Sequence, residues 1–471
     1  MVSPEVLCIA VSILYALYWY STRTFQHWKN KGVHYKEPVI LFGNIKDRFL
    51  FRKSFHDVQR DLYRSFEGHK FAGYYEGRRP VLMLRDPELI KYVLVRDFQH
   101  FVDRPTLKTK IPPYIRNNLL NLEGQHWKNV RALMTPTFSS KKLKFMENMV
   151  DQCAVQMTQF LHKTATAKND KAQLEMKDFY GRFTLDVIGT CAFGVQCDSL
   201  KEEAEFVKMA SRFNELSLPY RIFIFVIVLF APQLARFIPL TLVNRKVITF
   251  LADVVKKTKD YRMKHKEERR NDFLQHMMDA AEEDTKQIQN NLVKVTSYKN
   301  GQHTYTLQNI ILDEDTIIAQ SILFLLAGYE SPSTLLTWMS YELAMNQEIQ
   351  DKLREEVKQV LDRHDGKCSY EALQEMTYLE MVILETLRKH PPVARLDRIC
   401  TQPYTIPGTD IVLEAGTSVS ISIMGLHNDP QYYPKPDVFD PERFLPEIKN
   451  FRSPYVFLPF GSGPRHCIGH Q

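Results

Sequence analysis

Apolar side chains recur at helical spacing along most of the chain. Windows in which they return every three or four residues, with few glycines between them, are typical of helices. Such windows predict five long helices, at Lys142 to Thr164, Leu174 to Phe193, Val243 to Lys266, Asp313 to Asn346 and Gln347 to Leu361. Strand-like runs are shorter and fewer, so helices are expected to outnumber strands.

Short strands are predicted at two places. Val81 to Leu84 is a β-like run, followed by a turn signal at Asp86-Pro87. The polar segment from Glu282 to Thr306 carries Asn300-Gly301 between alternating residues, which predicts a hairpin on an exposed excursion. We find no internal repeat and no domain linker. The expected fold class is therefore mainly α with small β-sheets (α+β), in one domain.

The chain begins with an uncharged apolar run, VLCIAVSILYALYWY, from Val6 to Tyr20. Counted from Val2 it has about 19 residues, within the ~17–25 that span a bilayer. A signal peptide is disfavoured because the start, MVSPE, is acidic and aromatic residues stand where cleavage would fall. The run predicts a membrane anchor; a buried core helix is the alternative.

The anchor gives the expected organisation of the chain: an anchor over residues 1–22, an entry segment over 23–44 and a catalytic domain over 45–471. Basic residues directly behind the anchor predict that the rest of the chain faces the cytosol. A second apolar run, Arg221 to Leu240, is interrupted by proline and arginine, so it is too broken to span a bilayer. It predicts either a segment that dips into the membrane surface or one buried in the core.

Composition and charge add little to this picture. With 44% hydrophobic, 12% aromatic and 25% charged residues, the chain is expected to be ordered throughout. The net charge of +7 suits an anionic membrane surface, and we predict no nucleic-acid partner. The basic stretch from Lys256 to Arg270 is interpreted as a solvated helix face. Seven cysteines are scattered without a CxxC pair, which argues against a disulfide framework or a zinc finger.

One cysteine lies in a loop suited to bind iron. The segment Phe460 to Gly469 reads FGSGPRHCIG, and its glycines permit a tight backbone and close approach to a flat ring. A thiolate ligand at Cys467 would need backbone N–H groups turned toward its sulfur. Arg465 carries a permanent positive charge that can pair with a carboxylate, and the Phe460 ring can exclude water from the sulfur. The alternative is a buried cysteine in a glycine-rich turn.

The pattern FxxGxRxCxG resembles the haem-binding signature of the cytochrome P450 superfamily. The resemblance implies that the chain binds haem b, with Cys467 as the axial iron ligand and Phe460, Arg465 and Gly469 beside the cofactor. Further matches extend over nearly the whole chain, and they are most similar to microsomal, insect members that oxidise lipophilic compounds.

Other motifs of this family follow in the expected order. Glu385-Thr-Leu-Arg388 resembles its ExxR motif, and Pro441-Glu-Arg443-Phe444 resembles its PERF segment. The resemblance implies that Glu385, Arg388 and Arg443 form a buried structural cluster. By itself, Glu and Arg three residues apart on a helix most often make only a surface pair.

Three further residues are implied to meet the haem carboxylates. Trp127-Lys-Asn-Val-Arg131 resembles the family's WxxxR motif, and Arg398 resembles its propionate-binding arginine. Taken singly, an arginine in such a position is most often a solvated surface charge. A haem carries two carboxylates, however, so several arginines are reasonable once the cysteine loop is accepted.

The segment Ala327-Gly328-Tyr-Glu330-Ser331 is similar to the oxygen-activating AGxET motif of the family. Leu323, Ala327 and Ser331 fall on one helix face, where the small Ala327 and Gly328 would leave room for O2. The resemblance makes Glu330 and Ser331 the catalytic acid and hydroxyl that relay protons. An ordinary glycine-containing buried helix is the alternative.

Ser331 and Pro332 depart from that motif. Ser331 stands where threonine is usual, and Pro332 follows it inside the predicted helix. Serine keeps the hydroxyl but lacks the β-branch that fixes χ1, so it can turn away to bond the Ala327 carbonyl. We therefore expect proton delivery to be less well aimed.

The substrate itself is not specified by the sequence. By analogy with the family, an apolar pocket would be lined by Leu323, Leu326, Val393 and Ala394. The implied substrate is a small lipophilic molecule.

The favoured function is monooxygenation with electrons from NADPH. They would be delivered by a reductase, with cytochrome b5 as a further partner, at the endoplasmic reticulum membrane. Two alternatives remain: a haem-thiolate isomerase or dehydratase, which Glu330-Ser331 argues against, and a haem-binding protein without turnover.

The chain stops at Gln471, shortly after Cys467. In the family, a helix beneath the haem and a terminal strand pair follow Cys-x-Gly. We therefore expect the sequence to be incomplete at its C-terminal end and to hold haem poorly as written.

Overall fold

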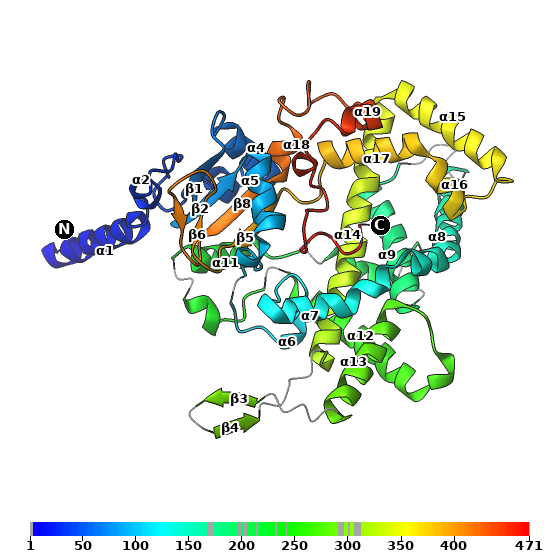
Figure 1. Ribbon diagram of the computed structural model, residues 1–471, viewed down its shortest axis with the longest axis horizontal. Coiled ribbons are helices and arrows are strands. Elements are labelled where there is room, and N and C mark those ends of the chain that lie inside the picture. The colour runs from blue at the N-terminus through cyan, green and yellow to red at the C-terminus, as the bar shows by residue number, and fades with distance from the viewer. Residues whose placement is uncertain are drawn as a thin grey trace.

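The computed structural model of the chain (Figure 1) describes residues 3–106, 108–166, 173–195, 197, 199–200, 205–212, 215–230, 233–241, 243–290, 296–299, 302–305 and 312–470. Within these residues most elements are helices, and the strands form one four-stranded sheet and two two-stranded sheets. The predicted α+β class is confirmed.

The larger sheet has four strands in the order β1 (Phe71–Glu76), β2 (Arg79–Leu84), β8 (Ser418–Ser422) and β5 (Arg395–Ile399). β2 and β8 are parallel, whereas β1 and β5 run antiparallel to their neighbours. The strand predicted at Val81 to Leu84 is confirmed within β2. Consecutive residues of β1, β2 and β8 are buried, so the sheet is covered on both faces.

Two small sheets pair β3 (Thr296–Lys299) with β4 (Gln302–Tyr305) and β6 (Tyr404–Thr405) with β7 (Val412–Leu413). Lys299 lies opposite Gln302, so the predicted hairpin is confirmed, although Asn300-Gly301 itself lies outside the described residues. The predicted excursion from Glu282 is wrong at its start, because α13 continues through Glu282 to Asn290.

The α-helices are α1 (Pro4–Thr22), α2 (His27–Asn30), α3 (Lys46–Phe49), α4 (Phe55–Arg64), α5 (Pro87–Lys91), α6 (Pro113–Arg116), α7 (Gly124–Met134), α8 (Ser140–Thr166), α9 (Met176–Phe193), α10 (Glu205–Ser211), α11 (Leu218–Phe230), α12 (Arg245–Lys264), α13 (Phe273–Asn290), α14 (Glu314–Met345), α15 (Gln347–Arg363), α16 (Tyr370–Glu375), α17 (Thr377–Lys389), α18 (Ile423–His427) and α19 (Pro446–Lys449). The shorter turns are the π-turn η1 (Tyr92–Arg96) and the 3-10 turns η2 (Phe98–His100), η3 (Thr135–Phe138), η4 (Leu234–Phe237), η5 (Lys266–Glu268), η6 (Pro441–Phe444) and η7 (Pro454–Val456). The five long helices predicted from the sequence are confirmed as α8, α9, α12, α14 and α15, with their ends within two residues.

Asp86-Pro87 begins a helix, so the predicted turn is wrong. Asp86 is the N-cap of α5, and its carboxylate accepts the N–H groups of Glu88 and Leu89, each at 3.0 Å. Pro87 occupies the first helical position, where its missing N–H costs nothing. Aspartate followed by proline marks helix starts as well as turns, because both need the same side-chain acceptor.

α14 is the axis of the helical part of the molecule (Figure 1), and it packs against α6, α9, α12 and α17. Asp313 caps its start by accepting the Thr316 N–H at 2.7 Å. Consecutive residues from Thr316 to Ile322 are buried, so this part of the helix is enclosed on all sides. One large apolar cluster surrounds it, and a second surrounds the four-stranded sheet.

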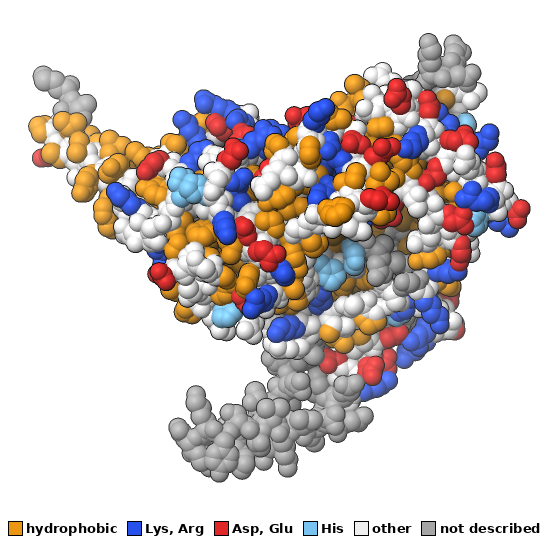
Figure 2. Space-filling view, turned by 45° about the horizontal axis from the view of Figure 1, so that its top comes forward, with side chains coloured by type: hydrophobic (Ala, Val, Ile, Leu, Met, Phe, Trp, Pro, Cys, Tyr) orange, Lys and Arg blue, Asp and Glu red, His pale blue; other side chains and the backbone are white. Residues whose placement is uncertain are grey.

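α1 stands clear of the body of the protein (Figure 2), with apolar side chains such as Leu14 and Tyr15 exposed. Within its 19 residues an 18-residue window has a mean hydropathy of 1.4, and 6% of that window is buried. The alternative of a core helix is therefore wrong, and length and composition are sufficient to cross a membrane.

The apolar run from Arg221 to Leu240 is divided between two environments. On one side Ile224, Ala235 and Leu240 form a small buried cluster that includes α11 and η4. On the other side α11 exposes apolar residues, among them Phe223. Burial in the core therefore holds for one side of the run only, and contact of the exposed side with a membrane surface stays a prediction.

The basic stretch from Lys256 to Arg270 is not wholly a solvated face. Arg262 is buried, and its guanidinium makes two hydrogen bonds to the Asp272 carboxylate, at 2.7 and 2.6 Å, and one to the Phe193 carbonyl. This pair fastens α12 to the start of α13 and to the end of α9. The earlier interpretation is wrong for Arg262.

Replacing Asp272 by Asn should lower the free energy of unfolding by about 3 kcal/mol or more, because it leaves the buried Arg262 without a counter-charge. Asp279→Asn is the matched control, since its pair with Arg269 is largely exposed, with side-chain exposures of 33% and 67%. That variant should lose less than about 1 kcal/mol. Urea unfolding followed by circular dichroism measures both, and equal losses would contradict the analysis.

Candidate functional site

The Cys467 loop is a tight turn that two glycines make possible. Gly461 and Gly463 have φ of +71° and +72°, and the Cys467 N–H donates to the Phe460 carbonyl at 2.8 Å. A Cβ on Gly463 would lie 1.9 Å from the Leu94 carbonyl oxygen, so the loop touches the backbone of η1. Cys467 itself is exposed.

Gly469 and the Cys467 sulfur do not show the backbone geometry and the hydrogen bonds that the sequence analysis expected. Gly469 is not among the residues with positive φ, and a Cβ there would meet Phe138 at an ordinary 3.7 Å. Its proximity to a flat ring therefore stays a prediction. Among the described residues, no hydrogen bond reaches the Cys467 Sγ, so the N–H groups expected around the sulfur are not found. The Phe460 ring lies 6.2 Å from that of His470.

Arg465 anchors the loop to the preceding part of the chain. It is buried, and its guanidinium donates to the carbonyls of Val102, Leu119 and Leu122 at 2.8, 3.3 and 2.7 Å. The same group lies 4.1 Å from the centre of the Trp127 ring. These bonds use three of the five N–H groups of the guanidinium, so the expected contact of Arg465 with a carboxylate stays a prediction.

Three further arginines near the loop lack a comparable set of acceptors. Arg398 is 2% exposed; its Nη1 donates to the Asp397 carbonyl at 2.8 Å, and its Nε is buried without a partner. Burial, with Arg104 and Arg465 nearby, lowers the pKa of Arg398 to about 9. Burial also lowers the pKa of Arg131, which lies 5.9 Å from the centre of the Trp127 ring.

The cluster has the electrostatics of an anion site. A lowered arginine pKa means that nearby positive charge and missing water disfavour the cation, and a bound anion would reverse this effect. Two carboxylates of a haem fit that requirement, and Trp127, Arg131 and Arg398 all lie near Arg465 or Cys467, whereas their contact with haem stays a prediction. The donor set therefore fits haem b.

Arg104 belongs to this cluster but was missed by sequence reasoning. Its Nη2 donates to the Arg465 carbonyl at 3.4 Å, and burial lowers its pKa, with the charge of Asp397 opposing and that of Arg131 adding to the effect. A bridge between Asp103 and Ile399 brings Arg104 beside Arg398. No local pattern marks this arginine, because only the fold joins those two distant segments.

The ExxR and PERF motifs meet in a cluster in which Glu385 and Arg388 are fully buried and Arg443 is half-buried. Arg388 binds both oxygens of Glu385, at 2.7 and 2.8 Å, and the two side chains are 0% exposed. Arg443 Nε lies 3.6 Å from Glu385 Oε1, which also accepts the Asp440 N–H at 3.0 Å. Sequence reasoning placed all three charged residues correctly.

The acid and the hydroxyl of the α14 motif point in different directions. The Ser331 hydroxyl donates to the Ala327 carbonyl at 2.7 Å, which confirms that serine turns back onto its own helix. Glu330 instead forms an ion pair with Lys177 of α9, at 3.1 Å. The structure therefore does not bring the two catalytic candidates together.

Gly328 faces α9, so its small size serves helix packing. A Cβ on Gly328 would lie 2.7 Å from the Ile188 side chain. That Gly328 also leaves room for O2 stays a prediction, and Ala327 and Ser331 are both exposed. α14 continues through Pro332, and Lys177 and Thr184 of α9 donate to the carbonyls of Glu330 and Tyr329, at 3.2 and 2.9 Å.

The residues predicted to line a substrate pocket differ in their exposure to solvent. Leu323 and Leu326 are half-buried beside the α14 cluster, and Val393 is 49% exposed. Ala394 is buried, and its carbonyl accepts the Met424 N–H at 3.0 Å. Leu323, Leu326 and Val393 keep an accessible surface, whereas Ala394 is enclosed.

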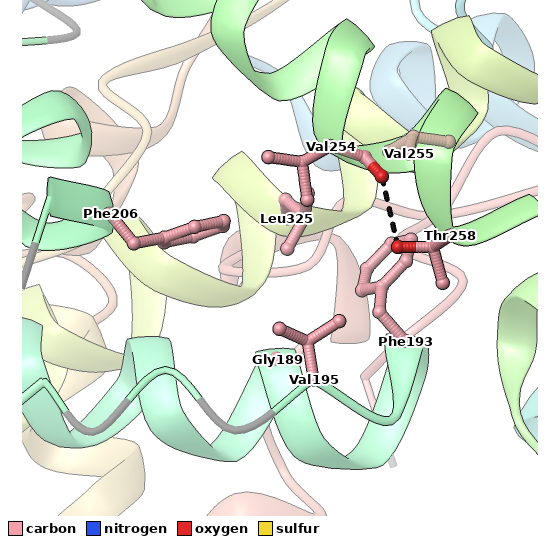
Figure 3. Close-up of a pocket in the computed structure, with 8 residues that line it drawn as sticks. All are labelled: Gly189, Phe193, Val195, Phe206, Val254, Val255, Thr258 and Leu325. Carbon is pink, nitrogen blue, oxygen red and sulfur yellow. Dashed lines mark hydrogen bonds between the residues drawn. The ribbon is translucent and has the colours of Figure 1, made fainter. Parts of the chain in front are cut away.

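A small apolar pocket lies elsewhere, between α9, α10, α12 and α14 (Figure 3). Its lining residues are Gly189, Phe193, Val195, Phe206, Val254, Val255, Thr258 and Leu325. Leu325 precedes Ala327 by two residues, a rotation of roughly 200° about α14. The pocket is therefore on the opposite side of the helix from Ala327, and it is a packing space rather than the candidate site.

A mainly helical domain with one exposed cysteine in a glycine loop, arginines beside it and a buried ExxR cluster defines a haem-thiolate protein. A family model described as cytochrome P450 matches residues 33–471, so the chain belongs to the cytochrome P450 family. It is thus a monooxygenase-type oxidoreductase that uses haem b.

Insect proteins are among its relatives, in agreement with the sequence analysis. The chain is 36% identical to cytochrome P450 6k1 of Blattella germanica over 468 residues, 99% of this chain and 87% of that protein. It is 37% identical to cytochrome P450 9e2 of the same organism, over 98% and 87% of the two chains. Cytochrome P450 6a2 of Drosophila melanogaster is 34% identical over 98% and 88%.

The loop geometry predicts unequal effects for two glycine substitutions. Gly461→Ala adds only the cost of a left-handed alanine, roughly 1–2 kcal/mol, because the nearest atom to its Cβ would be 3.7 Å away. Gly463→Ala should cost more, since the Leu94 carbonyl must move as well. Thermal unfolding of the haem-free protein measures both. A Gly463→Ala protein as stable as Gly461→Ala would contradict this reading of the loop.

Proposed function

We propose that this cytochrome P450 takes electrons from NADPH through a membrane-bound reductase and inserts one oxygen atom of O2 into a lipophilic substrate. Cytochrome b5 is proposed as a second electron donor. α1 would hold the protein in the endoplasmic reticulum membrane, with the catalytic domain on the cytosolic side, because basic residues follow that helix. The exposed apolar side of α11 supports a second contact with lipid.

One observation carries this proposal: the exposed thiol of Cys467 lies beside arginines that form no direct ion pair with any of the described residues. Cys467 would bind the iron, while Arg104, Arg131 and Arg398 would hold the two carboxylates. Bound haem supplies an iron that takes up electrons and O2, which no side chain can do. Residues proposed to complete the cofactor site are Trp127, Ala327, Phe460, Arg465 and Gly469.

Proton delivery would rest mainly on Ser331. Its hydroxyl must leave the Ala327 carbonyl to reach a bound substrate or oxygen, and a serine can make that rotation about χ1 easily because it lacks a β-branch. Glu330 would act only after leaving Lys177. Leu323, Leu326 and Val393 are proposed to contact the substrate.

Removal of the proposed ligand gives the first test. Cys467→Ala should abolish the red-shifted Soret band that a thiolate-ligated haem shows in its reduced CO complex. Cys400→Ala should keep it, because Cys400 is buried in the sheet cluster. Absorption spectra of the two purified variants decide, and loss of the band in Cys400→Ala alone would refute the assignment.

The Ser331 hydroxyl can be tested by graded substitution. Ser331→Thr should retain turnover or improve the coupling of NADPH oxidation to product, because the β-branch restricts χ1. Ser331→Ala should divert more NADPH into hydrogen peroxide. Both are measured with reductase, NADPH and one fixed lipophilic substrate identified by a spin-state screen. Equal coupling in all three proteins would remove Ser331 from the mechanism.

A further inference from the structure

His427 joins the ExxR helix to the chain that leads into the Cys467 loop. It is the last residue of α18 and is 0% exposed. Its Nε2 lies 2.9 Å from the Leu458 N–H, and its Nδ1 lies 3.2 Å from the Arg388 carbonyl. An N–H can only donate and a carbonyl can only accept, so the ring must be neutral with its proton on Nδ1.

Two further contacts fix the same residue. The His427 carbonyl accepts Nη1 of Arg388 at 2.9 Å, and the imidazole stacks on Phe457, with ring centres 5.2 Å apart and planes 24° apart. These contacts fix both the imidazole ring and the backbone of His427. The position of Leu458 therefore depends on where α17 places Arg388.

From Leu458 the connection continues to the cysteine. The Leu458 carbonyl accepts the Gly461 N–H at 3.0 Å, and the carbonyl of Phe460 accepts the Cys467 N–H at 2.8 Å. Two backbone hydrogen bonds thus join the His427 contact to the amide of Cys467. This path runs through the turn that sets the direction of the thiol.

We propose that His427 is a positioning residue for Cys467, holding the entry of the cysteine loop at a fixed distance from the Glu385–Arg388 cluster. The inference rests on the proposed role of Cys467 as iron ligand. His427 would act on the haem site indirectly, because its contact with the cysteine loop is the hydrogen bond to Leu458.

The charge state of the ring follows from its surroundings. Burial, reinforced by Arg388, lowers the pKa of His427 to about 3. Arg388 faces the ring from α17 and Tyr433 faces it from the segment after α18, with Glu385 and Arg443 behind Arg388. Protonation would place a second N–H at Nε2, directly opposite the Leu458 N–H.

The sign of the pH effect follows. The unfolded chain takes up a proton on this histidine near pH 6.5, while the folded protein resists it down to about pH 3. Stability from a neutral His427 is therefore complete above about pH 6.5 and is lost progressively as the pH falls toward 3.

Three variants of the full chain separate positioning from packing. His427→Phe keeps the stacked ring but removes both hydrogen bonds, whereas His427→Gln keeps an acceptor that can reach the Leu458 N–H. Tyr433→Phe is the matched control, because Tyr433 lies in the same buried region and its hydroxyl donates to Val456 instead, at 3.5 Å. Should the Phe variant fail to fold, His427→Asn replaces it, since its shorter amide cannot reach Leu458.

Hydrogen exchange of the peptide 458–467 in haem-free protein is the first measurement. We expect exchange at least about fivefold faster in His427→Phe, the effect of one lost hydrogen bond, and near-normal exchange in His427→Gln and Tyr433→Phe. The second is the fraction of thiolate-type CO band, which should fall in His427→Phe and be restored in His427→Gln. Between pH 6.5 and 4 the wild type should lose this band sooner than His427→Gln.

Equal exchange in the wild type and His427→Phe, or equal defects in the Gln and Phe variants, would overturn the proposal. Failure of the proposed function would look different, because the CO band would then survive in Cys467→Ala. The exchange of peptide 458–467 would still report on His427 in that case.

Discussion

The buried ion pair of Glu385 and Arg388 is the interaction on which the site depends. Removing two charges from water costs several kcal/mol for each ion, and the cost is offset only when every remaining donor and acceptor is used. Here the pair recruits the Asp440 N–H and the carbonyls of His427 and Pro436. These requirements hold α17, α18 and the segment before η6 in one arrangement, and the cysteine loop is attached to that arrangement through Leu458.

The arginines beside the loop present the opposite case. The positive charge of Arg398 is buried, yet its Nε lacks a partner, and the neighbouring arginines repel it. Such a cluster opposes folding until an anion neutralises it. Binding of a dianionic cofactor would therefore stabilise the fold as well as fill the site, since a ligand that binds only the folded state adds its binding free energy to stability.

The helical repeat of apolar residues made most of the fold predictable from the sequence. The five long helices could be located because a helix repeats its apolar face, and the ExxR cluster could be located because its residues resemble a motif of the cytochrome P450 family. Arg104 and His427 could not, since their roles arise from contacts with residues about 360 and 30 positions away. Asp86-Pro87 was misread because a helix cap uses the same residue types as a turn. Arg262 was misread because a buried ion pair uses the same residue types as a solvated helix face.

α14 shows how packing and chemistry compete within one motif. Gly328 allows α9 to approach closely, and Pro332 removes an N–H that would otherwise continue the helical ladder. Side chains of α9 then donate to the carbonyls of Tyr329 and Glu330, and Lys177 also holds the Glu330 carboxylate. The side chains of α9 that contact this part of α14 therefore also hold the acid of the motif on the α9 side. Ser331 lies on the exposed side instead, where its hydroxyl bonds only to the Ala327 carbonyl of its own helix among the described residues.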